Sequence, residues 1–458
     1  DWSAPPSTNA TGHLIFNNVN ALLQRWPNTY WRNGHTIMPA TIPAGTILYH
    51  GRSDNQIPTL PEWLAFDFEH AYLFCRGECW LLSVVTTRDL RLVYFDGSSA
   101  AKTRTGSMDS QDIFIWGYVR EEKIFSERER IIELCQWGKQ HGIDGFVRME
   151  MHFETMLCDF TAGLEVVSFL NLIPIAAGDD PRHSPPTHDP PAGWKGKLPA
   201  IASSMFEVVH AGSWHDRAPG ETRVHLDYSG LVTFYDTSLS SLVEARRGQT
   251  RSQHRLINIS TSDSARVRDR IEEVFTRKDS DTRSGVDWAS VTRVIVERYG
   301  ERLELLKYIL EPTSFSNVTE RAELFRAQLL IMLNPYMVIQ AVPKPDAHSS
   351  DTTWMAPVVH YCSTTQTLHI RRDTLTSQEL TILGAVEETL HEICRALSMM
   401  WVDAFDIESA GDDRLSELVN GWKHQVEGLM LWLDWSIWIR CDPECGPESM
   451  CHIPTWPF

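Results

Sequence analysis

A proline-rich stretch restricts how this chain can fold. Residues 179–199 read DDPRHSPPTHDPPAGWKGKLP, with six prolines and no apolar periodicity. Proline lacks a backbone N–H and fixes φ, so this stretch cannot supply an inner strand or the middle of a helix. We therefore expect a Pro-rich surface linker at 179–199, which divides the 458-residue chain into domains at 1–178 and 200–458.

The first domain has the sequence pattern of an α+β fold. Short β-branched runs, separated by Gly, Asp and Ser, predict strands at 46–49, 81–85 and 92–95. Residues 127–142 carry apolar side chains at helical spacing, which predicts a helix there. A sheet that packs against at least one helix is the expected core of this domain.

The second domain is expected to be mainly helical after an initial β-hairpin. The hairpin is predicted from Arg223 to Tyr235, with its turn at Ser229-Gly230. Helices are predicted from two apolar stripes, and these comprise Val267, Ile271 and Val274, and then Leu383, Val386, Leu390, Ile393 and Leu397. Residues 291–299 alternate well enough for a strand, although the leucines that follow favour a helix.

Charge and hydropathy exclude two classes of partner. The chain has 42 basic and 60 acidic residues, a formal charge of −18, and no concentrated basic run. Such a chain would be repelled by a polyphosphate surface, so we expect no nucleic-acid partner. The charge-free stretch 327–343 contains Asn334-Pro335, so it does not resemble the roughly twenty-residue span of a membrane helix. No membrane span is expected, and the oligomeric state stays unknown.

Several features are typical of a secreted glycoprotein. The sequence opens at Asp1 with neither Met nor an apolar leader, which we interpret as removal of a targeting segment. Acceptor sequons at Asn9, Asn258 and Asn317 predict surface glycosylation. Nine cysteines fit disulfides formed in an oxidising compartment, with one thiol left over. We therefore expect an extracellular protein with disulfides.

The absence of several common motifs limits which enzyme classes the sequence suggests. The chain has no GxxxxGK[ST], GxGxxG, GxSxG or HExxH motif, so phosphate-loop enzymes, dinucleotide Rossmann folds, common serine hydrolases and zincins are not first hypotheses. Its cysteines form no CxxC pair, and we expect no metal site. One ExxH-type cluster occurs at 387–392, but no second helix of that kind accompanies it. We interpret this cluster as a polar border beside an apolar helix face.

Three segments of the first domain place a polar residue beside an apolar, strand-like body. The first is a strand that ends in His50-Gly51-Arg52, where glycine permits close approach of a ligand or of another backbone. The second is a strand that begins near Trp63 and runs through Asp67 into a short helix, with aromatic rings that could sandwich a planar group or form core. The third is a strand opened by Glu154. Each segment could also be an ordinary strand end.

In this order and spacing the three segments resemble the ADP-ribosyltransferase fold, most closely the branch of poly-ADP-ribose polymerases and diphtheria toxin. The family has a His-Gly at the end of its first strand, a strand-to-helix segment of the form YFAD…S…Y, and a catalytic Glu that opens a strand. The matching residues are His50-Gly51, Trp63 to Asp67 with Tyr72 or Phe74 behind, and Glu154. The resemblance covers about residues 44 to 162, and it implies an ADP-ribosyltransferase-like mixed sheet in the first domain.

The resemblance also implies roles for these residues. His50 would hold the nicotinamide ribose, Trp63 and Tyr72 would form stacking walls, and Glu154 would bond the ribose 2′-hydroxyl and steady the oxocarbenium ion. Gly51, Arg52 and Asp67 complete the expected substrate-binding set. Arg52 stands where the family usually has Ser or Thr, Trp63 replaces Tyr, and residues 69–74 contain no Ser. No cofactor is required in this hypothesis, and NAD is the candidate substrate.

Three functions remain as hypotheses. The first is a secreted enzyme that cleaves or transfers a ribosyl bond, most simply an NAD glycohydrolase or an ADP-ribosyltransferase. The second is a secreted glycoside hydrolase acting on a cell-wall glycan, in which Glu154 works with a second carboxylate such as Asp67 or Glu150. The third is a non-catalytic protein that reuses the fold for binding. The expected partner is thus a small molecule or a glycan.

Overall fold

The chain forms two compact units, which are described here separately. The computed structural model describes residues 2–24, 34–75, 79–172, 211–212, 220–277, 284–342, 351–405, 407–446 and 448–449. The sheet unit comprises residues 21–234, 239–279 and 439–458. The helical unit comprises residues 1–20, 235–238 and 280–438. At this level the expected α+β fold, with a sheet in the first part and helices in the last, is confirmed.

The sheet unit is built on one mixed sheet of ten strands, in the order β10-β1-β5-β6-β7-β3-β2-β4-β8, with β9 also paired to β1. The strands are β1 (Thr36–Ile42), β2 (Ile47–Arg52), β3 (Glu62–Ala65), β4 (Cys79–Thr86), β5 (Leu90–Phe95), β6 (Gly145–Met149), β7 (Phe153–Leu157), β8 (Leu164–Leu172), β9 (His225–Leu226) and β10 (Val232–Thr233). The pair β5–β6 is parallel and the other pairs are antiparallel. The strands predicted at 46–49, 81–85 and 92–95 are confirmed as β2, β4 and β5.

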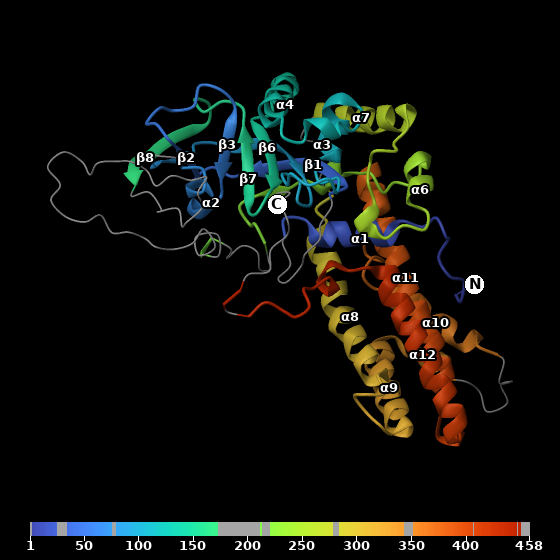
Figure 1. The fold of residues 1–458 in the computed structure, drawn as a ribbon. Coiled ribbons are helices and arrows are strands. Elements are labelled where there is room, and N and C mark those ends of the chain that lie inside the picture. The colour runs from blue at the N-terminus through green and yellow to red at the C-terminus, as the bar shows by residue number, and fades with distance from the viewer. Residues whose placement is uncertain are drawn as a thin grey trace. The chain divides into compact units, whose positions relative to one another are not determined.

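Three helices pack on the sheet and make its main core. They are α3 (Asp109–Trp116), α4 (Glu127–His141) and α7 (Thr261–Thr276), and Figure 1 shows them gathered beside β1 and β6. Their apolar side chains join those of β1, β5, β6 and β7 in a single buried cluster. The predicted helix at 127–142 is confirmed as α4, which ends where Gly142 adopts a left-handed φ of +65°.

The predicted hairpin at 223–235 is wrong. Its two short strands, β9 and β10, pair with β1 instead of with each other. A 3-10 turn at Tyr228–Gly230 separates them, so both add to the edge of the larger sheet. The sheet unit therefore takes in chain from both sides of the predicted linker, and its bounds cross the predicted domain boundary. The linker at 179–199 lies outside the described residues.

The helical unit contains long helices that run side by side in Figure 1. They are α8 (Trp288–Leu310), α9 (Val318–Leu333), α11 (Ser377–Ala404) and α12 (Asp412–Leu433), accompanied by α1 (Gly12–Ala21) and α10 (Ala356–Thr364). Two shorter helices, α2 (Phe68–Tyr72) and α6 (Ser240–Arg246), belong to the sheet unit. Residues 291–299, which the sequence left between strand and helix, lie within α8, where Ile295, Tyr299 and Leu303 are buried at helical spacing.

Local signals explain where α11 begins. Thr376 and Glu379 form a capping box, in which each side chain satisfies a backbone N–H of the first turn. The apolar stripe predicted from Leu383 to Leu397 is buried along this helix. The ExxH-type cluster makes structural contacts on the same helix, because Glu388 accepts a hydrogen bond from the Gly12 N–H at 2.8 Å and Glu392 pairs with Arg395 at 2.6 Å.

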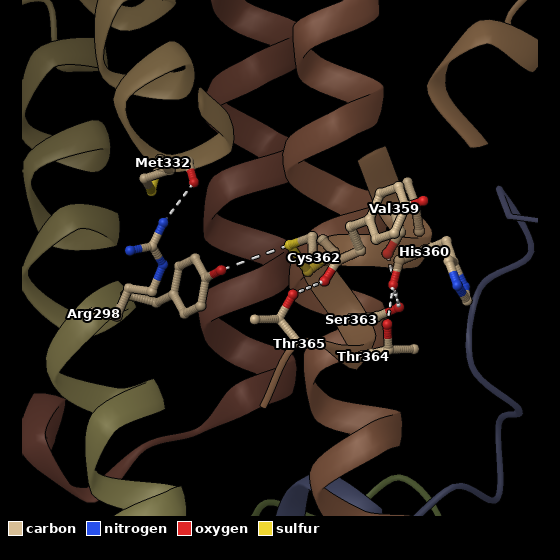
Figure 2. Close-up of a disulfide and its surroundings, with 11 residues drawn as sticks. Arg298, Met332, Val359, His360, Cys362, Ser363, Thr364 and Thr365 are labelled. Atoms are coloured by element: carbon tan, nitrogen blue, oxygen red, sulfur yellow. Dashed lines mark hydrogen bonds between the residues drawn. A yellow bond between two sulfur atoms is a disulfide. The ribbon is translucent and has the colours of Figure 1, made fainter. Parts of the chain in front are cut away.

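Disulfides occur in both units, as the cysteine content predicted. Cys75–Cys79 and Cys135–Cys158 lie in the sheet unit, and Cys362–Cys394 joins α10 to α11. Figure 2 shows the surroundings of the last bond, whose Cys362 sulfur lies 3.6 Å from the hydroxyl of Tyr299. Disulfides of this kind are typical of an oxidising compartment. Among the described residues, no helix is long and apolar enough to cross a membrane.

Candidate functional site

The sheet opens between β2 and β3, and a pocket lies at this opening. These two strands share a single paired position, Tyr49 with Ala65, whereas β2 pairs with β4 along its whole length from Ile47 to Arg52. The pocket has a volume of about 280 Å³. It is lined by Tyr49, His50, Gly51, Arg52, Ser53, Glu62, Trp63, Ala65, His70, Ala71, Phe74 and Glu154.

Most of the residues singled out from the sequence meet in this pocket. His50, Gly51 and Arg52 come from β2, Trp63 from β3 and Glu154 from β7. They meet because Ala65 of β3 pairs directly with Glu154 of β7, which brings the third segment beside the second. Sequence reasoning did not assign Glu62 or His70 to the site, although Glu62 opens the strand and His70 lies within the short helix that it had identified.

Two predicted substrate-binding residues are not among the pocket-lining residues. Asp67 is buried as the N-cap of α2, where its Oδ1 accepts a hydrogen bond from the His70 N–H at 2.7 Å. Its Oδ2 lies 3.0 Å from Nδ1 of His152. Tyr72 is buried in α2 and lies beside Phe68, with ring centroids 5.9 Å apart. Phe74 takes the place at the pocket that the sequence offered to either aromatic.

Gly51 is required by the chain itself. A Cβ at this position would lie 2.0 Å from the carbonyl oxygen of Ala71, which is too close for any side chain. Of the two explanations that the sequence allowed, close approach of another backbone is the one that the structure contains. The glycine lets α2 pack onto β2, and this contact holds His70 at the pocket wall.

The rim of the pocket is a half-buried set of ion pairs around Glu62. Its carboxylate lies 3.2 Å from Nε2 of His50 and 3.4 Å from Nη1 of Arg52. The close contact with His50 and the charge of Arg52 lower the pKa of Glu62, so it stays ionised near neutral pH. Arg52 also pairs with Asp54 at 2.9 Å. Glu62 of β3 thus orients His50 of the neighbouring strand β2.

A buried chain of alternating charges forms a floor beneath the pocket and reaches the pocket lining at Glu154. Arg148 and Glu154 are cross-strand partners on β6 and β7, and Nε of Arg148 donates to Oε1 of Glu154 at 2.6 Å. Nη2 of the same guanidinium contacts Glu127 at 2.6 Å, and Lys102 lies 3.0 Å from the other oxygen of Glu127. The charge order is therefore Lys102, Glu127, Arg148, Glu154.

Burial and neighbouring charges shift the pKa values of Glu127 and Arg148 in opposite directions. For Glu127, burial favours the neutral acid, but Arg148 and Lys102 outweigh it and lower the pKa to about 2. For Arg148, burial favours loss of the proton, but Glu127 and Glu154 outweigh it and raise the pKa. Both groups therefore stay charged, and the guanidinium holds one oxygen of Glu154 in a fixed position.

In the part of the chain that the structure describes, two buried groups of side chains could hold a metal ion. Within each group the candidate ligand atoms lie within 4.8 Å of one another. The groups are Asp67, His70 and His152, and His70, Glu150 and Glu154. Nε2 of His70 lies 3.9 Å from Oε2 of Glu154. Burial lowers the pKa of His70, and burial raises the pKa of Glu150 to about 7.

The three sequons lie on exposed asparagines. Asn9, Asn258 and Asn317 are each exposed, so an attached sugar would meet no buried surface at any of them. Asn317 also caps α9 through its side-chain oxygen, which accepts from the N–H of Thr319 at 2.9 Å. Its amide nitrogen, the atom that carries a glycan, is not used in that contact.

Comparison with known proteins places the pocket inside a region shared with yeast proteins. Residues 7–81 and 75–177 match the family model described as the YPL277C N-terminal domain. The uncharacterized protein YOR389W of Saccharomyces cerevisiae is 25% identical, over 96% of this chain and 81% of its own length. The uncharacterized protein YPL277C of the same yeast is 30% identical, over 48% of this chain and 60% of its own length.

No solved structure matches the chain. Every residue that lines the pocket falls within the segment covered by the YPL277C N-terminal domain model. The names of the two yeast proteins state no activity.

Proposed function

We propose that the sheet unit has an ADP-ribosyltransferase-like fold and that its pocket cleaves or transfers a ribosyl bond. The observation that carries this proposal is the meeting of His50, Trp63 and Glu154, from three strands, in one pocket where the sheet opens. These are the residues on which the sequence resemblance rests. NAD is the simplest candidate substrate, with nicotinamide as the leaving group.

The geometry of Glu154 suits this chemistry. Arg148 binds Oε1, which leaves Oε2 to interact with a substrate. In the proposed reaction the bond between the anomeric carbon and the nicotinamide nitrogen breaks, and positive charge develops on the ribose. A fixed carboxylate stabilises that charge more in the transition state than in the ground state, and its hydrogen bond to the 2′-hydroxyl strengthens in the same way.

The pocket limits what can be enclosed. Small-molecule pockets usually span about 300–1,000 Å³, and this one, at about 280 Å³, lies just below that range. It suits the nicotinamide and ribose end of a dinucleotide better than the whole molecule. Trp63 and Phe74 offer ring faces for the base, and His50 offers a hydrogen bond to a ribose hydroxyl. The pocket is open and is lined by His50, Trp63 and Glu154. This counts against the third hypothesis, a non-catalytic protein, because its cleft would be filled or blocked.

The test is release of nicotinamide from NAD by the purified chain and by the Glu154→Gln variant. Removal of an electrostatic contact to the transition state lowers kcat by about 10²–10³ fold, and a loss of this size is expected. If the wild-type chain releases no nicotinamide, the ribosyl proposal fails. Equal release by both proteins would show that Glu154 does not act in the reaction.

A matched control separates chemistry from folding. Glu127→Gln also removes a carboxylate that contacts Arg148, but Glu127 is not among the pocket-lining residues. Both variants disturb the same buried guanidinium, so similar losses of stability are expected. Glu127→Gln should lower turnover by less than about tenfold, because Arg148 still holds Glu154. Equal loss of turnover in the two variants would mean that Glu154 matters only for folding.

A glycoside hydrolase is the second candidate. The observation that favours it is the closeness of Glu150 to Glu154, since paired carboxylates are the usual requirement of that reaction. Such an enzyme would hydrolyse a furanoside or a cell-wall glycan and ignore NAD. Screening the wild-type chain on chromogenic furanosides and on wall polysaccharides, beside the NAD assay, decides between the two candidates.

We also propose that the chain is a secreted glycoprotein. The three disulfides between described cysteines and three exposed sequons support this localisation. Expression through a secretory pathway, followed by removal of N-glycans with an endoglycosidase, should lower the apparent mass. The triple variant Asn9→Gln, Asn258→Gln and Asn317→Gln should show no such change. A wild-type chain with the same mass before and after the treatment would refute glycosylation.

A further inference from the structure

We propose that His70, Glu150 and Glu154 bind a divalent transition-metal cation beside the pocket. The three side chains come from α2, from the turn between β6 and β7, and from the start of β7. Each of them is buried, with exposed fractions of 1%, 4% and 3%. This site departs from the expectation, made from the sequence, that the chain holds no metal.

Unpartnered polar atoms are the first observation that points to a ligand. Both ring nitrogens of His70 and one carboxylate oxygen of Glu150 are buried without a hydrogen-bond partner in the part of the chain that the structure describes. Buried polar groups are nearly always paired, so these atoms require an explanation. A cation bound to a lone pair of His70 and to Glu150 supplies one.

Distances are the second observation. Zinc lies about 2.0–2.2 Å from histidine nitrogen and carboxylate oxygen, so two ligands of one ion lie at most about 4.4 Å apart. The candidate ligand atoms lie within 4.8 Å of one another, and Nε2 of His70 lies 3.9 Å from Oε2 of Glu154. Small side-chain movements therefore suffice to complete a three-ligand site.

The surrounding charges are the third observation. Arg148 donates to Oε1 of Glu154, which is the kind of outer contact that orients a ligating carboxylate. Glu127 pairs with Lys102 and Arg148, and Glu154 pairs with Arg148, whereas no basic side chain of the described residues forms an ion pair with Glu150. An uncompensated negative charge is costly in a buried site. A cation therefore suits this cluster, in spite of the two basic side chains nearby.

The ligand set limits which metal binds. Imidazole is a ligand for zinc and other transition metals, whereas Mg²⁺ and Ca²⁺ prefer sites made of oxygen alone. One imidazole with two carboxylates therefore suits Zn²⁺ or Mn²⁺. Three protein ligands leave coordination positions open, and His70 and Glu154 both line the pocket. Resting on the proposed function, those positions would bind the vicinal hydroxyls of a ribose, and the bound ion would then replace the direct contact between Oε2 of Glu154 and the 2′-hydroxyl.

The test is calorimetric titration of the full disulfide-bonded chain, stripped with a chelator, with Zn²⁺, Mn²⁺ and Mg²⁺ in turn. Binding of one equivalent of Zn²⁺ or Mn²⁺ is expected, at least about tenfold tighter than Mg²⁺. The Glu150→Gln variant should lose at least about tenfold in that affinity. The matched control is Glu62→Gln, a carboxylate change at the same pocket but outside the ligand set, and its metal affinity should equal that of the wild type.

Two outcomes would overturn the site. One is the absence of Zn²⁺ and Mn²⁺ binding by the wild-type chain at millimolar metal, and the other is equal affinity in Glu150→Gln and Glu62→Gln. If Glu150→Gln does not fold, Co²⁺ added to the stripped wild type gives a second measurement. Visible absorption bands of a protein-bound, nitrogen-containing Co²⁺ site support the proposal, and the spectrum of hydrated Co²⁺ alone refutes it.

Nicotinamide release, measured with chelator and with each ion, separates this site from the proposed function. If the chain binds the metal but releases no nicotinamide, the metal site is supported and the proposed ribosyl reaction is refuted. If the chain releases nicotinamide but binds neither Zn²⁺ nor Mn²⁺, the ribosyl reaction is supported and the metal site is refuted. Release that requires the ion supports both.

Discussion

The sheet unit and the helical unit differ in what they bury. Among the described residues, the buried lysine and arginine side chains all lie in the sheet unit, and they are Lys102, Arg130, Arg148 and Arg246. The core of the helical unit is mainly apolar and aromatic, as in the stacked rings of Phe325 and Trp422, whose centroids lie 4.8 Å apart, although Glu379 and Glu392 are also buried there. Buried charge is costly and a well-packed apolar core is not. The difference teaches that the costly interactions are concentrated in the sheet unit, which is also the unit that contains the pocket.

The largest expected effect comes from breaking the buried charge chain. Arg148→Met leaves Glu127 and Glu154 buried without their shared guanidinium. Removal of one partner from a buried pair costs about 3–5 kcal/mol, so the free energy of unfolding should fall by that amount in urea. The control is Arg371→Met in the helical unit, where the pair with Asp373 is exposed, and no measurable change is expected. Equal effects would remove the contrast between the units.

The second effect tests what stabilises the helical unit. The Cys362→Ala, Cys394→Ala double variant removes the disulfide between α10 and α11, which joins residues 32 apart in sequence. A loss of about 2–4 kcal/mol is expected, because the cross-link restricts the unfolded chain. The control is Cys441→Ala, since Cys441 is a free cysteine, and its thermal unfolding should match the wild type. Similar curves for both variants would show that the disulfide contributes little.

The third effect is a pH dependence of the sheet unit. Burial lowers the pKa of His254 to about 4, with a further contribution from the charge of Arg246. The unfolded histidine has a pKa near about 6.5, so below that pH the unfolded state binds a proton that the folded state does not. Stability is therefore complete above about pH 6.5 and falls as the pH drops toward 4.

His254→Gln should make the urea midpoint less dependent on pH between these values. The control is His424→Gln, a change at an exposed histidine of α12, which should leave the wild-type slope intact. A steep slope retained in His254→Gln would assign the pH dependence to other groups of the sheet unit.

The smallest effect is expected at the rim of the pocket. Glu62→Gln removes ion pairs with His50 and Arg52, but Glu62 is 25% exposed and Arg52 keeps its contact with Asp54. Half-exposed pairs contribute about 0–1 kcal/mol, so the urea midpoint should move little. A loss as large as that of Arg148→Met would show that rim and floor are equally important to the fold.

Local patterns were sufficient for much of the fold. Helical spacing identified α4 and α11, and β-branched runs identified β2, β4 and β5. These patterns work because side chains that face a core repeat every 3.6 residues in a helix and every two in a strand. They failed at β9 and β10, which are two residues long and pair with β1 at a distance in sequence. A turn signal alone does not say which strand is the partner.

The candidate site, like the fold, was predictable only where local patterns were sufficient. The sequence by itself determined three chemically distinctive residues, His50, Trp63 and Glu154, because each ends or opens a recognisable local element. Only the tertiary structure decided that they share a pocket and that Asp67 and Tyr72 do not line it.

The partners of Glu154 were also decided by the tertiary structure. Arg148 reaches it through the register of β6 and β7, and His70 lies beside it because β3 leads into α2 next to β7. The physical reason is that periodicity reports which way one side chain faces, whereas a pairing of charges depends on how separate strands are aligned.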